Sequence, residues 1–225
     1  MTEAGGGAAG AKQWDPRREW PPHPRRLVAA LGVVFDAMIV AHLARVNRQQ
    51  LLVESFTGRA VIPGRVQGEL SGLAYGIAGI GPLLVPTCFA TVERMNREQA
   101  QRAVDRQRSW HGKAVIEADP TKDRGEAEAL ELCWRREERC LVSQDANAML
   151  GARNQGTPVF AIPDVLLDFA AQRRLRAENA WQIYLEIVGD EPWNEAWFWR
   201  VIDETDRERS RQKFMAHAAN FGAVL

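Results

Sequence analysis

The sequence predicts an α/β protein in which a parallel β-sheet is covered by helices on both faces. Two observations predict this fold class. Short apolar runs of strand length alternate with longer segments of helical periodicity, and the links between them are short. Such alternation is typical of parallel strands joined by right-handed helical crossovers. With 225 residues, the chain is long enough for one sizeable α/β domain, or for one domain with an appendage.

The elements follow one another from residue 27 onward. A run rich in Val, Leu and Ala ends in a buried strand just before Asp36, and a helical segment with a glycine stop at Gly58 follows it. The expected strands are 32–35, 59–66, 113–120, 139–145 and 157–163. The expected helices are 37–58, 66–82, 91–110, 124–138, 146–156 and 164–175. Residues 82–90 show no clear preference.

The two ends of the chain differ from this alternating middle, which spans residues 27–175. Residues 1–26 are rich in Gly and Ala, then in Pro and basic residues, so a disordered or extended N-terminal arm is expected. Residues 176–225 are rich in Trp and helical in pattern, which predicts a C-terminal helical extension. The apolar run 27–34 is too short to span a bilayer, so no membrane association is expected.

Composition narrows the classes of function. The formal net charge is zero, so the chain as a whole has no general electrostatic attraction to nucleic acid or anionic membrane. Three cysteines without a CxxC or Cys/His spacing indicate reduced thiols in a cytoplasmic protein and argue against a zinc site.

Acidic residues recur where the predicted strands end and the following helices begin. Asp36 and Asp145 end two strands, and Glu69, Glu126 and Glu128 lie early in helices. Ligands of open parallel sheets bind outside the carboxyl ends of the strands, so these acids are expected to converge. Taken singly, each has a structural explanation, because Asp is a favoured helix N-cap and Glu is favoured in a first helical turn.

Converging carboxylates repel one another, and a divalent cation relieves that repulsion. Oxygen ligands without thiolate or imidazole partners suit Mg²⁺ or Mn²⁺. Such a centre activates water and stabilises charge on a phosphoryl group, so phosphodiester hydrolysis is the chemistry that this pattern favours.

Four segments, VVFDAMIV, VIPGRVQGEL, DRGEAEALELC and LVSQDANAM, occur in the order seen in a known family. In residues 27–175 the chain resembles the PIN-domain ribonucleases. The resemblance implies a three-layer α/β/α fold and Mg²⁺- or Mn²⁺-dependent cleavage of RNA. It also implies frequent homodimers. Many bacterial members resemble VapC-type toxins, each neutralised by a cognate antitoxin protein.

The resemblance also implies a set of site residues. The family's acids match Asp36, Glu69 and Asp145, with the third acid on Glu128 and Glu126 as the alternative; a nearby hydroxyl matches Ser143. Two residues apart on a helix, Glu126 and Glu128 point in nearly opposite directions, so one of them should line the site. The chain departs from the pattern at Asn147, where a further acid often stands, and in having Glu at the third position.

An acidic site needs flanking cations to hold RNA. The candidates are basic residues near the predicted acids or after the last core helix: Lys122, Arg124, Arg153, Arg173, Arg174 and Arg176. The alternative for these residues is a solvated helix face. Tryptophans of the extension could stack on bases, but packing on the core is the stronger expectation for Trp181, Trp193, Trp197 and Trp199.

Two functions therefore compete. The first is an endoribonuclease that forms the toxin half of a toxin–antitoxin pair. The second is a catalytically silent PIN-like module that binds RNA or a protein, which the Asn147 departure favours.

Overall fold

The computed structural model describes residues 27, 30–84, 88–136, 138–190 and 204–225. The expected N-terminal arm, 1–26, lies outside the described residues, as do Trp193, Trp197 and Trp199.

The described chain alternates strands and helices, beginning with β1 at the centre of the sheet. The strands are β1 (Gly32–Phe35), β2 (Ala60–Pro63), β3 (Ala90–Glu93), β4 (Arg139–Val142) and β5 (Val159–Phe160). The helices are α1 (Ala37–Arg45), α2 (Gln50–Phe56), α3 (Gly64–Leu73), a 3₁₀ turn η2 (Gly81–Leu84), α4 (Arg97–His111), α5 (Lys113–Ala118), α6 (Arg124–Cys133), α7 (Ala146–Asn154), α8 (Ile162–Ala171), α9 (Ala177–Asp190) and α10 (Glu204–Asn220).

Among the described residues, the sheet has five strands in the order β3-β2-β1-β4-β5, and every pair is parallel. Strand β1 pairs with β2 on one side and with β4 on the other, so the strand order reverses at β1. The register aligns Phe35 with Val142, which brings the residues after β1 and β4 to the same edge. Such a reversal leaves a crevice between neighbouring strand ends, where ligands bind in open α/β sheets.

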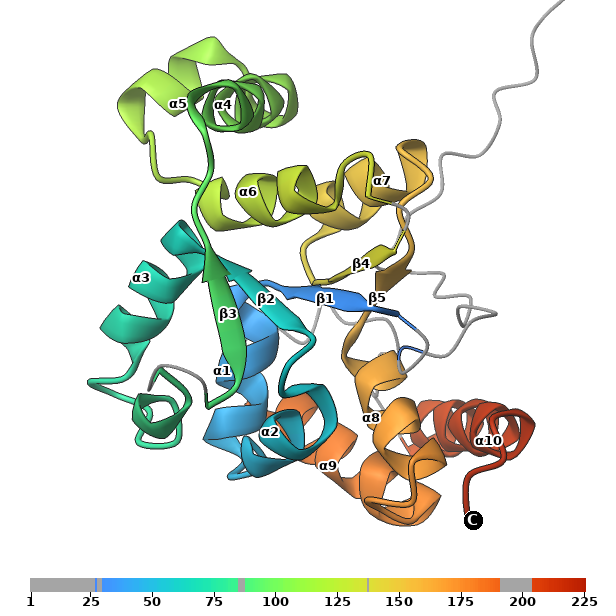
Figure 1. Cartoon of the computed structure of the whole chain (residues 1–225). Helices are drawn as coiled ribbons and strands as arrows, with labels where there is room; N and C mark the ends of the chain where they lie inside the picture. The colour runs from blue at the N-terminus through green and yellow to red at the C-terminus, as the bar shows by residue number, and fades with distance from the viewer. Residues whose placement is uncertain (1–26, 28–29, 85–87, 137, 191–203) are drawn as a thin grey trace, which may run out of the picture.

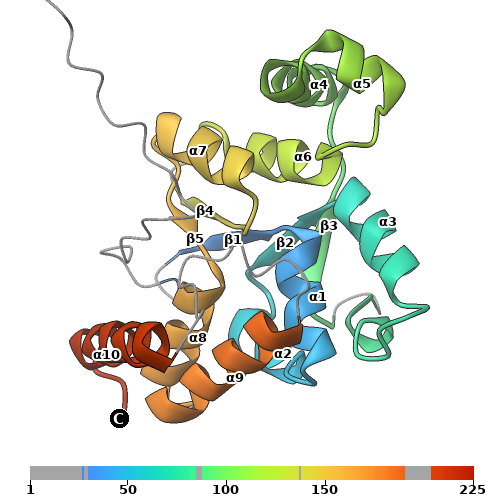
Figure 2. The ribbon, with the colours of Figure 1, turned by 180° about the vertical axis from the view of Figure 1, so that it is seen from behind.

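Helices cover both faces of the sheet, which confirms the predicted α/β architecture (Figure 1). Helices α6 and α7 lie on one face, with α4 and α5 outside α6, whereas α1, α2, α8, α9 and α10 lie on the other (Figure 2). Helix α3 packs against both α1 and α6, so it joins the two helical layers.

Alternate residues of a strand point to opposite faces of the pleated sheet, so they belong to two separate hydrophobic cores. Val33 and Phe35 belong to the larger core beneath α1 and α8, while Val34 and Leu141 belong to the smaller one beneath α6 and α7. Helices α6 and α7 pack closely at Gly151, where an added Cβ would lie 2.6 Å from Leu130 Cδ2.

The C-terminal helices are continuous with the larger core. Trp181 of α9 is 1% exposed and stacks on Tyr184, with a ring-centroid distance of 5.4 Å. Phe214 of α10 packs against the same indole at 5.5 Å. The expectation that Trp181 packs on the core is therefore confirmed.

Several expected elements are wrong. The expected helix 37–58 is two helices, α1 and α2, and the expected helix 66–82 ends at Leu73. Residues 113–120 are expected to be a strand, but Lys113–Ala118 forms α5; only Ile116 in this run is buried and Val115 is 43% exposed, so it does not form a buried strand. The missing strand is β3, whose residues were assigned to the unclear stretch 82–90 and to the helix 91–110. The helix starts later, at Arg97, where Asn96 and Gln99 form a reciprocal capping box.

In the described ranges, the structure contains no helix that combines the length and the apolar character needed to cross a lipid bilayer.

Candidate active site at the carboxyl edge of the sheet

Asp36 lies directly after β1 and is 1% exposed. Its Oδ1 accepts a hydrogen bond from the Ile39 amide at 3.1 Å, so it caps α1, as the purely structural explanation requires. Its Oδ2 accepts a second one from the Gln144 amide at 3.2 Å, in the chain just after the neighbouring strand β4. The carboxylate therefore does more than cap a helix, because it also joins the two strand ends at the reversal point.

Ser143 and Asp145 come from the end of β4. Ser143 is fully buried and its hydroxyl donates to the Asp36 carboxylate, while the Asp145 amide donates to Ser143 Oγ at 3.1 Å. Asp145 caps α7, accepting from the Ala148 amide at 2.7 Å. Ser143 thus holds Asp36 and the Asp145 backbone together from a buried position.

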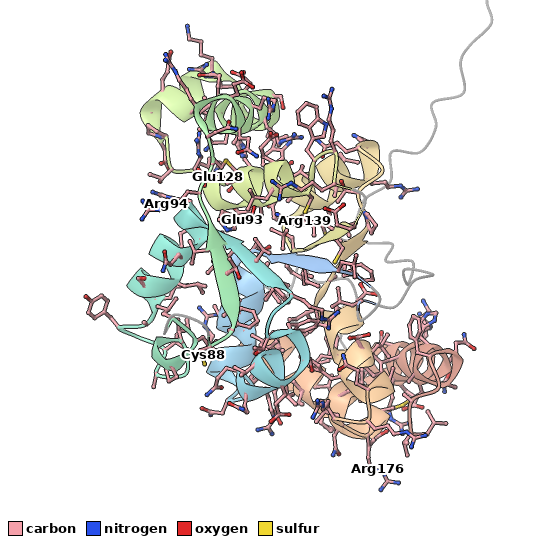
Figure 3. The ribbon with its side chains drawn as sticks, in the orientation of Figure 1. Cys88, Glu93, Arg94, Glu128, Arg139 and Arg176 are labelled. Atoms are coloured by element: carbon pink, nitrogen blue, oxygen red, sulfur yellow. The ribbon has the colours of Figure 1, made fainter. Side chains whose placement is uncertain are left out.

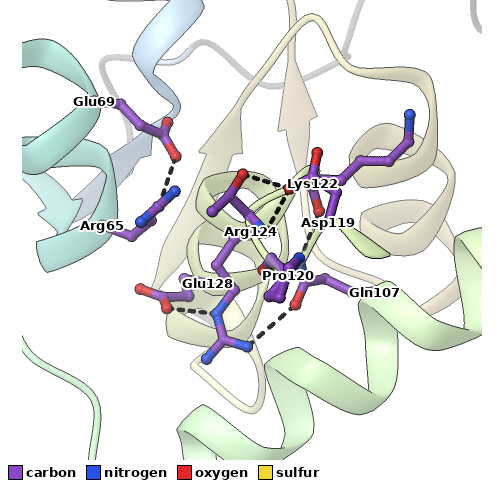
Figure 4. Close-up of polar contacts among 9 residues, drawn as sticks. Arg65, Glu69, Gln107, Asp119, Pro120, Lys122, Arg124 and Glu128 are labelled. Carbon is purple, nitrogen blue, oxygen red and sulfur yellow. Dashed lines mark hydrogen bonds and ion pairs between the residues drawn. The ribbon is translucent and has the colours of Figure 1, made fainter. Parts of the chain in front are cut away.

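Glu69 lies on α3, on the other side of this crevice. Its Oε1 accepts from Arg65 Nε at 3.3 Å, within the same helix (Figure 4). Its carboxylate also lies against the backbone of α6, since a Cβ on Gly125 would be 2.7 Å from Glu69 Oε2. The absence of a side chain at Gly125 therefore leaves the space that the Glu69 carboxylate occupies.

The two glutamates of α6 have different surroundings. Glu126 is repelled by Asp36, Asp145 and Glu69, so it is the one that faces the acids of the crevice. Glu128 accepts a hydrogen bond from Arg124 at 2.8 Å (Figure 4). It also repels the Glu69 carboxylate. This placement favours Glu126, the alternative, over the expected Glu128.

Burial and mutual repulsion act on the pKa values of these carboxyls. Burial raises the pKa of Asp36, hydrogen bonds from Ser143, Ile39 and Gln144 oppose the rise, and Asp145 adds to it. Burial also raises the pKa of Glu126, to about 8, with further contributions from Asp36, Asp145 and Glu69.

The pKa of Glu69 is likewise raised, first by burial and then by repulsion from Asp36 and Glu128, while Arg65 opposes the rise. Three carboxyls of one crevice are thus destabilised in their charged forms. A nearby divalent cation would reverse that effect.

The donor set fits a hard divalent cation by its chemistry, because it consists of carboxylates with a buried hydroxyl behind them. Asp36, Glu126 and Asp145 would hold the cation, with Glu69 on the α3 side. Over the described ranges, no three His, Cys, Asp or Glu side chains already lie in positions that ligate a metal.

The expected RNA-binding residues divide into two groups. Lys122 is exposed and precedes α6, whereas Arg124 is 17% exposed in its side chain and bonds to Glu128, Gln107 and the Ala100 carbonyl. Arg124 therefore joins α4 to α6 (Figure 4). The sequence gives no sign of this role, because it depends on a contact with residues 17 and 24 positions away.

The remaining basic candidates do not gather with the acids. Arg153 lies in the last turn of α7, at the opposite end from Asp145. Arg174 interacts with Glu54 at 3.8 Å, and Arg176 lies at the far end of the molecule from Glu128 (Figure 3). Arg173 is exposed just before Arg174.

Three residues of this edge carry no obvious sequence signal: Arg65, Gly125 and Gln144. Arg65 and Gly125 act through Glu69, and Gln144 acts through its backbone amide and through its Oε1, which accepts from the Ile162 amide at 3.2 Å. In comparisons with protein-family models, curated proteins and solved structures, the chain matches none of them.

Proposed function

We propose that the chain is a metal-dependent endoribonuclease of the PIN-domain type, acting in the cytoplasm. The observation that carries the proposal is the meeting of Asp36, Ser143 and Asp145 at the reversal of strand order, with Glu69 and Glu126 facing them from α3 and α6. A divalent cation bound there would neutralise these mutually repelling carboxylates and attract a phosphodiester substrate.

The reaction is hydrolysis of a phosphodiester bond. A water oxygen bonds to phosphorus, the bond from phosphorus to the ribose 3′-oxygen breaks, and the water's proton ends on that oxygen. Bound Mg²⁺ or Mn²⁺ supplies water activation and charge stabilisation. Asp36, Glu126 and Asp145 would hold the ion, and Glu69 would complete its ligands or orient the attacking water. Ser143 fixes the direction of the Asp36 carboxylate by its hydrogen bond.

The test combines metal binding with cleavage. Calorimetry with Mn²⁺ should show binding at millimolar concentration or tighter, and a labelled single-stranded RNA pool should be cut only when Mg²⁺ or Mn²⁺ is present. Wild-type protein that binds no Mn²⁺ and cuts no RNA would contradict the proposal.

The second candidate is a silent PIN-like module that binds RNA or a protein. Asn147, in the first turn of α7 beside Asp145, favours it, because an amide replaces a further acid there. RNA binding without Mn²⁺ binding is the result that distinguishes this candidate.

The proposal extends to a toxin that forms a homodimer and is neutralised by an antitoxin. Expression of the wild-type chain should then arrest bacterial growth, and co-expression of a small protein encoded beside it should relieve the arrest. Light scattering of the purified chain measures the dimer.

A further inference from the structure

Arg65 is a cation bonded to one of the acids of the proposed site, and the proposed reaction assigns it no part. It lies in the first turn of α3, directly after β2 ends, and its side chain is 39% exposed. The first turn of a helix carries the positive end of the helix dipole, so a cation there is disfavoured unless an anion compensates it. That anion is Glu69, one turn later, at 3.3 Å.

The partner of Arg65 is itself one of the acids expected to meet a divalent cation. Glu69 is repelled by Asp36 and Glu128 and lies against Gly125. When a cation engages Glu69, the guanidinium loses part of its attraction to that carboxylate. It remains within one helical turn of the site with five N–H donors, a geometry that suits phosphate oxygens.

A second cationic side chain lies near Arg65. Arg94 follows β3, and its Cγ is 3.9 Å from the position that a Cβ on Gly64 would take. Gly64 is the residue before Arg65, so both arginines lie at the start of α3. Figure 3 shows Arg94 projecting outward from the chain after β3. Phosphates of one strand could contact both.

We infer that Arg65 is a catalytic residue that binds the scissile phosphodiester of RNA when a divalent cation engages Glu69, and that Arg94 binds a neighbouring phosphate. This inference rests on the proposed nuclease function. Without metal, the ion pair with Glu69 keeps the Arg65 guanidinium beside the site. When the cation binds, Arg65 exchanges the Glu69 carboxylate for a non-bridging phosphate oxygen of the substrate. The negative charge that grows on the phosphoryl oxygens during attack then lies beside a fixed cation.

The experiment compares Arg65→Ala, Arg65→Lys and Arg94→Ala with wild type. Arg65→Ala should lower kcat about 100-fold, in the range expected for loss of one donor to a transition-state oxyanion. Its Mn²⁺ affinity by calorimetry should be unchanged or higher, because Glu69 no longer has a competing cation. Arg65→Lys should recover only part of kcat, since an ammonium lacks the planar fork.

Binding supplies a readout independent of turnover. Affinity for a fluorescent single-stranded RNA, measured in the inactive Asp36→Asn background, should fall on adding Arg94→Ala. The slope of log affinity against log salt should decrease by about 0.7 for each phosphate that is no longer neutralised. Arg211→Ala is the matched control, because Arg211 of α10 makes a similar ion pair with Glu178 of α9 at 2.9 Å. It should change none of these quantities.

The outcomes separate the inference from the function beneath it. If wild type binds Mn²⁺ and cuts RNA, and Arg65→Ala cuts equally fast, the role of Arg65 is overturned. The proposed nuclease function is then still supported. Absence of Mn²⁺ binding in Arg65→Ala also overturns the role of Arg65, because Arg65 would then only position Glu69. Wild type without Mn²⁺ binding and cleavage overturns both.

Discussion

The Asp36 carboxylate accepts a hydrogen bond from the Gln144 amide, 108 positions further along the chain, at 3.2 Å. The other carboxylate oxygen accepts from the Ile39 amide at 3.1 Å. One buried acid thus fixes the end of β1, the start of α1 and the second residue after β4. The position of the Asp36 carboxylate at the carboxyl ends of β1 and β4 is therefore fixed by backbone hydrogen bonds rather than by flexible side chains.

Asp36→Asn should abolish RNA cleavage without unfolding the protein. The amide keeps one oxygen to accept from Ile39 or Gln144 but does not carry the charge that would hold a cation. Removing one of the two backbone hydrogen bonds should lower the free energy of unfolding by about 1–3 kcal/mol. Cleavage of labelled RNA and urea denaturation measure the two effects.

Asp105→Asn is the control for that substitution. Asp105 is an exposed residue of α4 that pairs with Arg108 at 3.7 Å, so its change should alter neither quantity. An Asp36→Asn protein that cuts RNA at the wild-type rate would remove Asp36 from the proposed site.

Glu126→Gln should reduce the pH dependence of stability in metal-free protein. Folding raises the Glu126 pKa from 4.5 to about 8, so between these values the native state binds more protons than the unfolded state. Stability must therefore fall as the pH rises from about 4.5 to 8. Gln removes this contribution, and the variant should be more stable than wild type at pH 8 by about 1–3 kcal/mol after allowance for partial exposure.

Urea denaturation with a chelator, from pH 5 to pH 8, measures this difference. If the free energy of unfolding of wild type does not change between pH 5 and pH 8, Glu126 is neither buried nor repelled by Asp36 and Asp145 as described.

The sequence predicted those parts of the fold whose signal is local. β1 is an apolar run followed directly by Asp36, β4 is a short, mostly buried run three positions before Asp145, and α6 and α7 have clear helical spacing. Each is therefore predicted near its observed bounds. β3 was missed because an edge strand is half-exposed and carries few apolar residues; its burial depends on pairing with β2. The apolar run in α5 resembles a strand in sequence, yet only Ile116 within it is buried.

The acids of the candidate site are predicted from their positions after strands and in first helical turns. Which of these side chains face one another, and which neighbours they contact, is not predictable from the sequence. The choice between Glu126 and Glu128 depends on the rotation of α6 against Asp36, which the evenly apolar helix does not encode. Arg124 was expected to face phosphate, but Gln107 and Glu128 engage it. Both outcomes depend on tertiary contacts.

Gly125→Ala should separate stability from function. A Cβ at this position would lie 2.7 Å from Glu69 Oε2, so the Glu69 carboxylate must move, whereas the α6 backbone accepts Ala readily. The variant should be as stable as wild type or more so, with Mn²⁺ affinity and cleavage reduced about tenfold, equivalent to roughly 1.4 kcal/mol. Calorimetry and denaturation measure both quantities.

Gly72→Ala is the control for Gly125→Ala, because Gly72 lies in α3 and an added Cβ there meets nothing within 4 Å. It should give the helix-propensity gain without the decrease in Mn²⁺ affinity. Equal Mn²⁺ binding by both variants would mean that the position of Glu69 against α6 is unimportant for the site.

Trp181→Ala should destabilise the whole domain rather than affect RNA binding directly. Its indole is 1% exposed and packs between Tyr184 and Phe214, within the same core that contains Phe35 of β1. Removing a buried Trp side chain typically costs about 3–5 kcal/mol. Urea denaturation should therefore show a free energy of unfolding lowered by this amount. The core under β1 and the helices α9 and α10 should unfold together in one cooperative transition.

Trp181→Phe tests the same point with a smaller cavity and should lose less stability than Trp181→Ala. If Trp181 stacked on bases, Trp181→Phe would weaken binding of single-stranded RNA while leaving stability unchanged, which is opposite to the expected result. A biphasic denaturation curve, with α9 and α10 unfolding before the sheet, would contradict the view that the extension belongs to the core of the domain. The continuous packing from Phe35 through Phe56 to Phe169 argues for a single transition, since successive ring centroids lie 5.2 and 5.9 Å apart and all three rings share one core with Trp181.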